Sequence, residues 1–303
     1  MFDTAVIGGG PGGYTAALYC ARAGFNVVLF EAIGPGGQMA NTTLIENYPG
    51  FGGIDGYDLG EKMAANAERF GVKTINEKVT SVELVGDIKK IITSSGTYEA
   101  KTVVIAVGAD PKKMGLPDED AMRGHGVAYC ATCDGMMYKG KTVAVIGGGN
   151  TAVGDALYLS KMCSKVYLIH RRDSLRASKI YLETLKKADN IEIVWNARTT
   201  KILHEKNVTG IELEDTVSNS KRNIECSGIF VAIGRDPSTS MFKGIVDMDK
   251  NGYIVADETT RTSVPGVFAV GDVRTKPVRQ IVTAAGDGAT ASKYIEDYLA
   301  GDE

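Results

Sequence analysis

Cys130 and Cys133 carry the most reactive side chains of the sequence, in the segment Cys-Ala-Thr-Cys-Asp-Gly. Two thiols at this spacing can close a small, strained disulfide ring that is easily reduced. A carboxyl side chain, Asp134, directly follows the pair. The same cysteine spacing also suits half of a structural zinc site, and Asp134 could cap a helix.

The other cysteines argue against the zinc alternative. A four-cysteine zinc site needs a second close pair, and Cys20, Cys163 and Cys226 are isolated in the sequence. One histidine nearby, His125, would not complete a closed site with two cysteines. We therefore expect a redox pair and no metal, with the three isolated cysteines as inert packing residues.

A glycine-rich segment occurs twice, at a constant offset of 139 residues. Residues 5–19 read AVIGGGPGGYTAALY and residues 144–158 read AVIGGGNTAVGDALY, with nine of the fifteen positions identical. In each copy an apolar run precedes the glycines, a helix with small residues follows, and a second apolar strand comes next. This pattern predicts two βαβ units, each with a dinucleotide pyrophosphate at the helix N-terminus. The residues that permit the turn, the close approach and the helix packing are Gly8, Gly10 and Gly13, and then Gly147, Gly149 and Ala152.

The residue that ends the second strand differs between the two copies. The first copy has Glu31, whose carboxylate can accept hydrogen bonds from ribose hydroxyls. The second copy has His170, followed by Arg171, Arg172 and Arg176. Guanidinium groups bind a 2′-phosphate, which a carboxylate would repel. The first site therefore fits FAD and the second fits NADPH, although a solvent-exposed helix start would also explain the arginines.

Composition narrows the classes of partner. The chain has 303 residues, with 34 basic and 37 acidic side chains and a formal net charge of −3. This balance gives no electrostatic footprint for nucleic acid or an anionic membrane. No apolar run approaches the length of a spanning helix, and the N-terminus has no basic region typical of a secretory signal. We expect a cytoplasmic protein of one large or two medium domains.

Several motifs together resemble the low-molecular-weight thioredoxin reductases, which are FAD- and NADPH-dependent pyridine nucleotide-disulfide oxidoreductases. The resemblance runs nearly end to end. The motifs that carry it are GGGPGGYTAALY, the Gly36-Gly37-Gln38 turn, ENYPG at 46–50, CATCDG at 130–135, GGGNTAV at 147–153, HRRDSLRA at 170–177 and VFAVGD…RQIVTAAGDG at 267–288.

The resemblance implies two sets of cofactor-binding residues. The residues implied for FAD are Gly8, Gly10, Gly12, Gly13, Glu31, Gln38, Asn47, Gly108, Asp272, Arg279, Gln280 and Ile281. Those implied for NADPH are Gly147, Gly149, Asn150, Thr151, Ala152, His170, Arg171, Arg172 and Arg176. The sequence departs from the family at two positions: Val107 stands where a threonine is usual, and Gly154 stands where an acidic residue is usual.

The resemblance also implies a role for each residue of the redox motif. Cys133 lies against the flavin, and Cys130 is the outer thiol that attacks the disulfide of thioredoxin. Asp134 serves as general acid and base at the dithiol. The implied activity is thioredoxin-disulfide reduction by a homodimer. A different small redox protein as substrate, a dithiol oxidase and a non-catalytic flavin redox sensor remain alternatives.

The positions of the motifs predict the architecture. The FAD motifs lie at both ends of the chain and the NADPH unit lies between them, so one domain is inserted into the other. We expect an FAD-binding domain at 1–110 and 244–303 and an NADPH-binding domain with the CxxC pair at 111–243. The fold class is α/β, with two Rossmann-like parallel sheets that carry helices on their faces, each with a small antiparallel β-layer.

Overall fold

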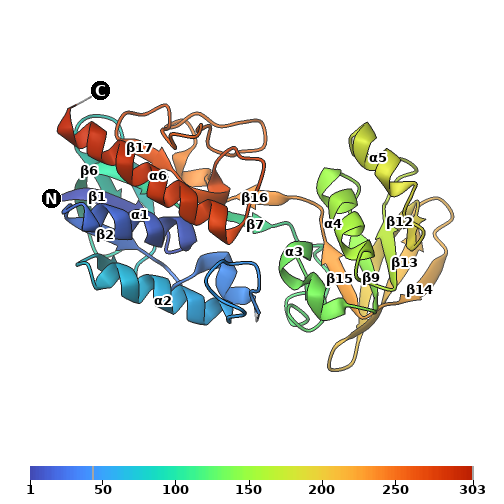
Figure 1. Ribbon diagram of the computed structural model, residues 1–303. Helices are drawn as coiled ribbons and strands as arrows, with labels where there is room; N and C mark the ends of the chain where they lie inside the picture. Colours follow the sequence, from blue (N-terminus) through green and yellow to red (C-terminus); the bar gives the residue numbers. More distant parts are fainter. Residues whose placement is uncertain (43, 302–303) are drawn as a thin grey trace. The chain divides into compact units, whose positions relative to one another are not determined.

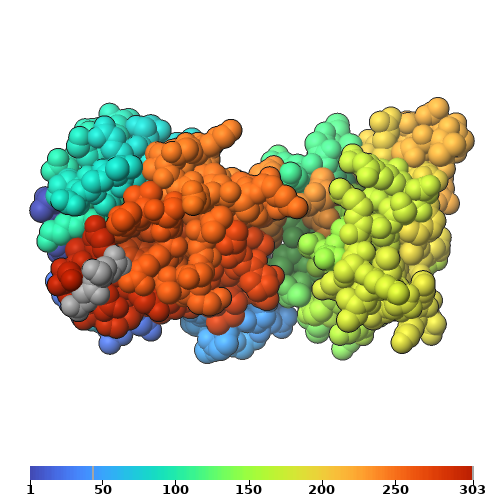
Figure 2. All heavy atoms as spheres, turned by 90° about the horizontal axis from the view of Figure 1, so that it is seen from above, coloured from blue at the N-terminus to red at the C-terminus, as the bar shows by residue number. Residues whose placement is uncertain are grey.

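The computed structural model describes residues 1–42 and 44–301, which form two compact units (Figure 1). The first unit consists of Met1–Asp110 and the chain after Arg235, and the second is Pro111–Arg235. In the space-filling view of Figure 2, the blue-to-cyan start and the orange-to-red end of the chain gather in one body, whereas the green-to-yellow middle forms the other.

The return to the first unit comes earlier in the chain than the expected boundary after Lys243. The division falls after Arg235, because the segment that follows packs into the first unit. Phe242 is fully buried there, in one hydrophobic cluster with Val246 and Ile254. A buried phenylalanine ties its neighbours to the core that covers it, and the polar sequence around residues 236–241 does not reveal this.

The first unit contains a sheet in the order β3-β2-β1-β6-β5-β4, with β17 also paired to β6. Its strands are β1 (Phe2–Ile7), β2 (Val27–Phe30), β3 (Lys73–Ile75), β4 (Ser81–Glu83), β5 (Lys89–Ile92), β6 (Thr97–Ile105) and β17 (Val267–Ala269). The long strand β6 pairs antiparallel with β5 through its first half and parallel with β1 through its second. The antiparallel strands therefore extend the parallel sheet and do not form a separate layer.

Alternate residues of this sheet face two different layers, as the strand period of two requires. Val6, Leu29 and Val104 pack with the small residues of the helices, whereas Ala5 and Val28 pack beneath the segment that carries Phe242. The helical segments of this unit are α1 (Pro11–Arg22), α2 (Gly56–Glu68), α6 (Ile281–Ala300), η1 (Gly37–Asn41), η3 (Ser240–Phe242) and η4 (Gly271–Val273). Both faces of the sheet are thus covered, which suits a parallel sheet.

The second unit has a parallel sheet in the order β11-β10-β9-β15-β8 and a separate antiparallel sheet β12-β13-β14. The strands are β8 (Val127–Ala128), β9 (Thr142–Ile146), β10 (Lys165–Ile169), β11 (Ile191–Val194), β12 (Ala197–His204), β13 (Val208–Asp215), β14 (Lys221–Glu225) and β15 (Gly228–Val231). The helices are α3 (Ala131–Asp134), η2 (Gly135–Tyr138), α4 (Asn150–Ser160) and α5 (Lys179–Leu185). Helix α4 covers one face of the parallel sheet and the antiparallel layer covers the other.

A short strand pair lies where the chain crosses between the units. Strand β7 (Ala109–Pro111) pairs with β16 (Arg235–Pro237), so both crossings run together. The predicted α/β class with two parallel sheets is confirmed, and the two βαβ units are the repeated segments of the sequence. Across the described parts of the chain, no helix is long and apolar enough to cross a membrane.

Candidate active site

The first glycine turn joins β1 to α1 in a conformation that only glycine adopts easily. Gly8 has φ +109°, and a Cβ there would lie 2.5 Å from the carbonyl oxygen of Ala106. A Cβ on Gly13 would lie 1.9 Å from the oxygen of Gly8. At Gly10, the N-cap of α1, a Cβ would meet no atom of the described residues within 4 Å. As a glycine, this N-cap also has no side chain that could accept a hydrogen bond from the helix. The turn therefore leaves space beside a helix N-terminus, which suits an anionic pyrophosphate.

Gly12 serves helix packing at the same turn. A Cβ on Gly12 would lie 3.2 Å from the oxygen of Ala284 in α6, and one on Gly288 would lie 2.4 Å from the oxygen of Gly12. Helices α1 and α6 therefore approach closely, and they run side by side in Figure 1. Because Gly12 and Gly288 have no side chains, the N-terminal part of α6 can lie close to the glycine turn.

Glu31 lies directly after β2, beside the turn. Its Oε2 accepts a hydrogen bond from the backbone N–H of Gly9 at 2.6 Å, and its Oε1 accepts from Ile33 and Gly34 at 2.9 and 3.3 Å. These bonds fix the carboxylate at the carboxyl end of the parallel strands, where nucleotides bind in such sheets. Oε2 accepts only one of these three bonds, so it has a further lone pair for a ribose hydroxyl.

Two predicted flavin residues, Asn47 and Gln280, meet although they are far apart in the sequence. The amide of Asn47 donates to the Oε1 of Gln280 at 3.1 Å. Gln280 is the N-cap of α6 and forms a capping box with Thr283, and Ile281 is the first residue of that helix. Gln38, in η1, donates to the carboxylate of Asp110.

Asp272 lies in η4, which follows β17 at the same edge of the sheet. Arg279 donates to the carbonyl oxygen of Asp272 at 3.4 Å, and its guanidinium carbon lies 4.1 Å from the ring centre of Tyr253. Gly108 adopts φ +69°, which explains a glycine at that position after β6. Gly108, Asp272 and Arg279 therefore belong to one unit, on segments that follow the parallel strands β6 and β17.

A buried ion cluster supports η4, and the sequence did not reveal it. Asp287 of α6 accepts hydrogen bonds from the Gly271 N–H at 2.8 Å, from Arg274 at 2.8 and 2.9 Å, and from Lys276 at 2.7 Å. Burial by itself would raise the pKa of Asp287, but the bonds from Arg274 and Lys276 hold it below its usual value. The cluster fixes the backbone next to Asp272.

The second glycine turn repeats the first at equivalent positions. Gly147 has φ +154°, and a Cβ there would lie 2.4 Å from the oxygen of Ala232. Gly149 is the N-cap of α4 and has no side chain that could cap the helix. A Cβ at this position would meet no atom of the described chain within 4 Å. Ala152 is fully buried in the helix face. Both turns therefore offer the same space beside a helix N-terminus, where Asn150 and Thr151 begin α4.

His170 occupies the position equivalent to Glu31. The side chain is buried, and a Cβ on Gly148 would lie 2.3 Å from its Nδ1, so the ring packs on the glycine backbone. Its Nε2 is buried without a hydrogen-bond partner in the described part of the structure. Burial lowers the pKa of the imidazole, and the charge of Arg176 lowers it further, so the neutral form is favoured. An unpartnered ring nitrogen at this turn fits a site that a polar ligand completes.

The three arginines of the second site are exposed, but their backbone is held in place. The Arg176 N–H donates to the oxygen of Gly148 at 2.7 Å. The oxygen of Arg172 accepts from the Asn196 N–H at 3.2 Å, and the oxygen of Arg171 accepts from the Thr216 hydroxyl at 3.4 Å. The guanidinium groups can therefore reach a phosphate from a fixed segment.

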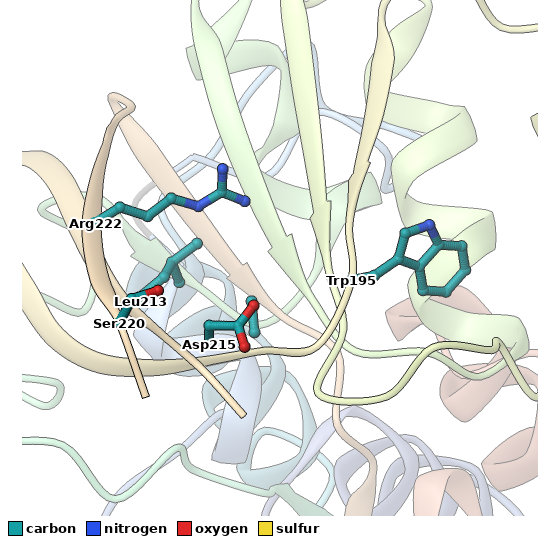
Figure 3. A pocket seen from close by; sticks show the side chains of 6 residues that line it. Trp195, Leu213, Asp215, Ser220 and Arg222 are labelled. Carbon is teal, nitrogen blue, oxygen red and sulfur yellow. The ribbon is translucent and has the colours of Figure 1, made fainter. Parts of the chain in front are cut away.

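A pocket of about 230 Å³ lies on the antiparallel layer of this unit (Figure 3). Figure 3 shows the indole of Trp195 directed away from the side chains of Asp215 and Arg222. The lining residues are Trp195, Ala197, Leu213, Asp215, Ser220 and Arg222. Asn196 and Thr216, which hold the arginine segment, are sequence neighbours of this lining, but none of the predicted site residues belongs to it.

Cys130 and Cys133 form a disulfide with Cα atoms 5.3 Å apart. The pair lies after β8, at the start of α3, where Cys130 is the N-cap. The backbone N–H groups of Cys133 and Asp134 both donate to the oxygen of Cys130, at 3.3 and 3.1 Å. A Cβ on Gly135 would lie 3.0 Å from Leu159, so the segment after the pair packs tightly on α4.

Asp134 is a half-buried carboxyl that directly follows Cys133 in the chain. Burial raises its pKa to about 6, although the charge of Arg123 acts in the opposite direction. It occupies the N-cap position of η2, but its side chain makes no capping hydrogen bond. The helix-cap explanation therefore does not account for the carboxyl, and a pKa close to neutrality suits a proton-transfer group.

The remaining cysteines have the environment of packing residues. Cys20, Cys163 and Cys226 are free thiols and are buried. Burial raises the pKa of Cys20 and of Cys226 to about 12 and also raises that of Cys163, so all three stay protonated and unreactive. In the described residues, no group of three or more His, Cys, Asp or Glu side chains is arranged to hold a metal ion.

Comparisons with known proteins agree with this geometry. The family model described as "Pyridine nucleotide-disulphide oxidoreductase" matches residues 2–288. A thioredoxin reductase of Streptomyces clavuligerus is 47% identical over 97% of this chain and 93% of its own length. A thioredoxin reductase of Listeria monocytogenes is 42% identical over 99% of this chain and 94% of its own length.

Solved structures give the same family over the full length. The crystal structure of thioredoxin reductase from Streptococcus pyogenes superposes with a TM-score of 0.93 at 42% identity and covers 99% of both chains. Thioredoxin reductase from Giardia duodenalis gives a TM-score of 0.92 at 35% identity, again over 99% of both chains. With two matching glycine turns and a Cys-x-x-Cys disulfide, the chain belongs to the pyridine nucleotide-disulphide oxidoreductase family, within its low-molecular-weight thioredoxin reductase branch.

Proposed function

We propose that the chain is an NADPH-dependent thioredoxin-disulfide reductase that uses FAD. The observation that carries the proposal is the Cys130–Cys133 disulfide, directly followed in the chain by a carboxyl, Asp134, whose pKa is raised to about 6. The names of relatives that are 42–47% identical over nearly the whole chain support thioredoxin as the substrate. Homodimerisation stays a prediction of the family resemblance, and a cytoplasmic location stays a prediction from the composition and the N-terminal sequence.

The two glycine turns fit the two cofactors. The space beside Gly10 and Gly149 accommodates a pyrophosphate, Glu31 suits the ribose hydroxyls of FAD, and His170 with its neighbouring arginines suits the 2′-phosphate of NADPH. When bound at these turns, NADPH would supply a hydride and FAD would supply the two electrons that reduce the disulfide. The protein residues orient both groups and move the protons.

The dithiol then reduces the protein substrate by exchange. The thiolate of Cys130 attacks one sulfur of the substrate disulfide, and the other substrate sulfur leaves with the bonding electron pair. Cys133 next attacks the Cys130 sulfur of the mixed disulfide, which restores the Cys130–Cys133 bond and releases the substrate dithiol. Asp134 takes up the thiol proton during this exchange and returns a proton in the reductive step.

The first test measures NADPH oxidation by the purified flavoprotein with thioredoxin and a colorimetric disulfide as terminal acceptor. We expect turnover that needs both thioredoxin and Cys130, so a Cys130→Ser variant should lose it. Flavin reduction without thioredoxin reduction would indicate a different small redox protein as substrate. Oxygen consumption with an added dithiol and no need for NADPH would indicate a dithiol oxidase. A flavin that binds NADPH but stays oxidised would indicate a redox sensor.

Replacement of Arg171 and Arg172 by alanine should weaken NADPH binding and leave NADH nearly unaffected. Each charge-assisted hydrogen bond to the 2′-phosphate contributes about 1.5–3 kcal/mol, so the double variant should raise the KM for NADPH about 100-fold or more. The measurement is the ratio of kcat/KM for NADPH and NADH. A matched Lys186→Ala, Lys187→Ala variant removes two exposed cations from the end of α5 and should keep the wild-type ratio. An unchanged ratio in the arginine variant contradicts the 2′-phosphate assignment.

A further inference from the structure

Glu119 is a buried carboxylate in the second unit, close to the redox pair in the chain but outside every predicted motif. Only 2% of its surface is exposed. Its Oε1 accepts from the Met114 N–H at 2.9 Å, and its Oε2 accepts from the N–H groups of Gly115 and Leu116 at 2.8 and 3.3 Å. The carboxylate thus closes the turn through which the chain enters this unit.

A fourth donor connects this carboxylate to the redox pair. The hydroxyl of Tyr129 donates to the Oε1 of Glu119 at 2.7 Å. Tyr129 is the residue between β8 and Cys130, and its side chain also packs against the cluster beneath the antiparallel layer. Burial and the bond to Glu119 raise the pKa of Tyr129, so the phenol stays protonated and keeps donating. Its hydrogen bond therefore holds the backbone just before the first cysteine.

The same side chain is covered by Arg123. The guanidinium carbon lies 5.3 Å from the ring centre of Tyr129, and the charge of Arg123 acts on Asp134. Glu119, Tyr129 and Arg123 thus form one connected group that ends at the redox motif. The tyrosine of this group precedes the disulfide in the chain, whereas the packing of Gly135 on α4 holds the segment that follows it.

The two anchors act on different cysteines. Cys130 follows Tyr129 directly, and Cys133 lies on α3, whose end packs on α4. The effective concentration of one thiol at the other depends on how firmly both backbone segments are held. A higher effective concentration favours the disulfide over the two free thiols. We propose that Glu119 and Tyr129 are positioning residues that hold Cys130 against Cys133 and thereby set the stability of the redox disulfide.

This inference rests on the proposed function, since it assigns a thermodynamic role within the same redox pair. The reaction to measure is the exchange of the protein disulfide with dithiothreitol. Dithiothreitol loses two electrons and two protons as it closes its own disulfide, and the Cys130–Cys133 bond breaks to give two thiols. The three isolated cysteines are free in both states, so alkylation after unfolding labels three thiols in the oxidised protein and five in the reduced one.

The decisive variant is Tyr129→Phe in the full-length flavoprotein, because it removes one hydroxyl and keeps the ring. We expect the equilibrium constant for disulfide formation to fall about three- to tenfold, which makes the midpoint potential about 15–30 mV less negative. Glu119→Gln should shift it in the same direction. The matched control is Tyr167→Phe, a tyrosine on β10 that packs against the same cluster and is remote in the chain from both cysteines. Its equilibrium should match the wild type.

Two results would overturn the inference. A Tyr129→Phe protein with a lower melting temperature and an unchanged redox equilibrium would show that the hydrogen bond serves only stability. An equal shift in the Tyr167→Phe control would show that any loosening of the unit has this effect. Failure of the proposed function is a separate outcome: the wild-type protein would then fail to couple NADPH oxidation to thioredoxin reduction, whatever the redox equilibrium of the Tyr129→Phe variant.

Discussion

The Cys133→Ser protein should lose thioredoxin reduction by more than about 10³-fold and still lose its yellow colour when NADPH is added. The serine cannot form a bond with Cys130, so the variant has no disulfide that could accept the electron pair and pass it to thioredoxin. The NADPH site that we propose lies on a different segment, around Gly149 and His170, which the substitution leaves intact. Stopped-flow absorbance of the flavin and a thioredoxin-coupled assay measure the two halves independently.

The chain offers a control with the same chemical change. Cys163 is a free thiol in the same unit, and its Sγ donates to the carbonyl oxygen of Tyr138 at 3.4 Å. A serine hydroxyl can make the same bond, so Cys163→Ser should keep thioredoxin reduction near the wild-type rate. Substantial thioredoxin reduction by the Cys133→Ser protein would contradict the assignment of the redox pair.

Much of the fold was predictable because the repeated segment specifies it locally. The offset of 139 residues carries over from the glycines to the structure, where Gly10 and Gly149 are both N-caps and both leave open space beside the helix. Each step of the pattern, from strand to turn to helix, depends on residues close in sequence. The glycine positions, Glu31 and His170 could therefore be identified without coordinates.

The supports of the site were not predictable, because they join distant residues that carry no motif of their own. Gly9 donates to Glu31, and Gly148 lies against the ring of His170. The only sequence feature that could have indicated these contacts is that both copies have a glycine at this position. The bond between Asp287 and Gly271 depends on the packing of α6. Local sequence also could not show that Phe242 is buried in the first unit. The expected domain boundary after Lys243 therefore differs from the observed division after Arg235.

The Asp134→Asn protein should reduce thioredoxin about 10²–10⁴-fold more slowly at neutral pH, because it can neither accept nor return the dithiol proton. The wild-type exchange reaction needs the carboxylate form, so its rate should fall as the pH drops below about 6, the raised pKa of this group. The asparagine variant lacks this titration, and its rate should lose that inflection. Rapid mixing of prereduced protein with oxidised thioredoxin from pH 5 to pH 8 measures both profiles.

Stability should move in the opposite direction to activity. The pKa of Asp134 is about 6 in the folded protein and near 3.8 in the unfolded chain, so folding favours the protonated form. Its contribution to stability is complete below about pH 4 and is lost as the pH rises through 6, a loss of at most about 3 kcal/mol. Asparagine is neutral throughout, so the variant should gain stability relative to the wild type between pH 5 and pH 8, as denaturant unfolding would measure.

Another half-buried carboxyl of this unit, Asp155, separates a catalytic role from burial alone. Burial raises the pKa of Asp155 in α4 to about 7, against the charge of Arg235. Asp155→Asn should therefore also gain stability as the pH rises, with a gain that extends to about pH 7 because its pKa is higher than that of Asp134. It should leave the exchange between prereduced protein and thioredoxin unchanged, because Asp155 is not adjacent to the cysteines in the chain. If both variants slow the exchange equally, the loss follows from removing a buried carboxyl from the unit, and Asp134 is not the proton-transfer group.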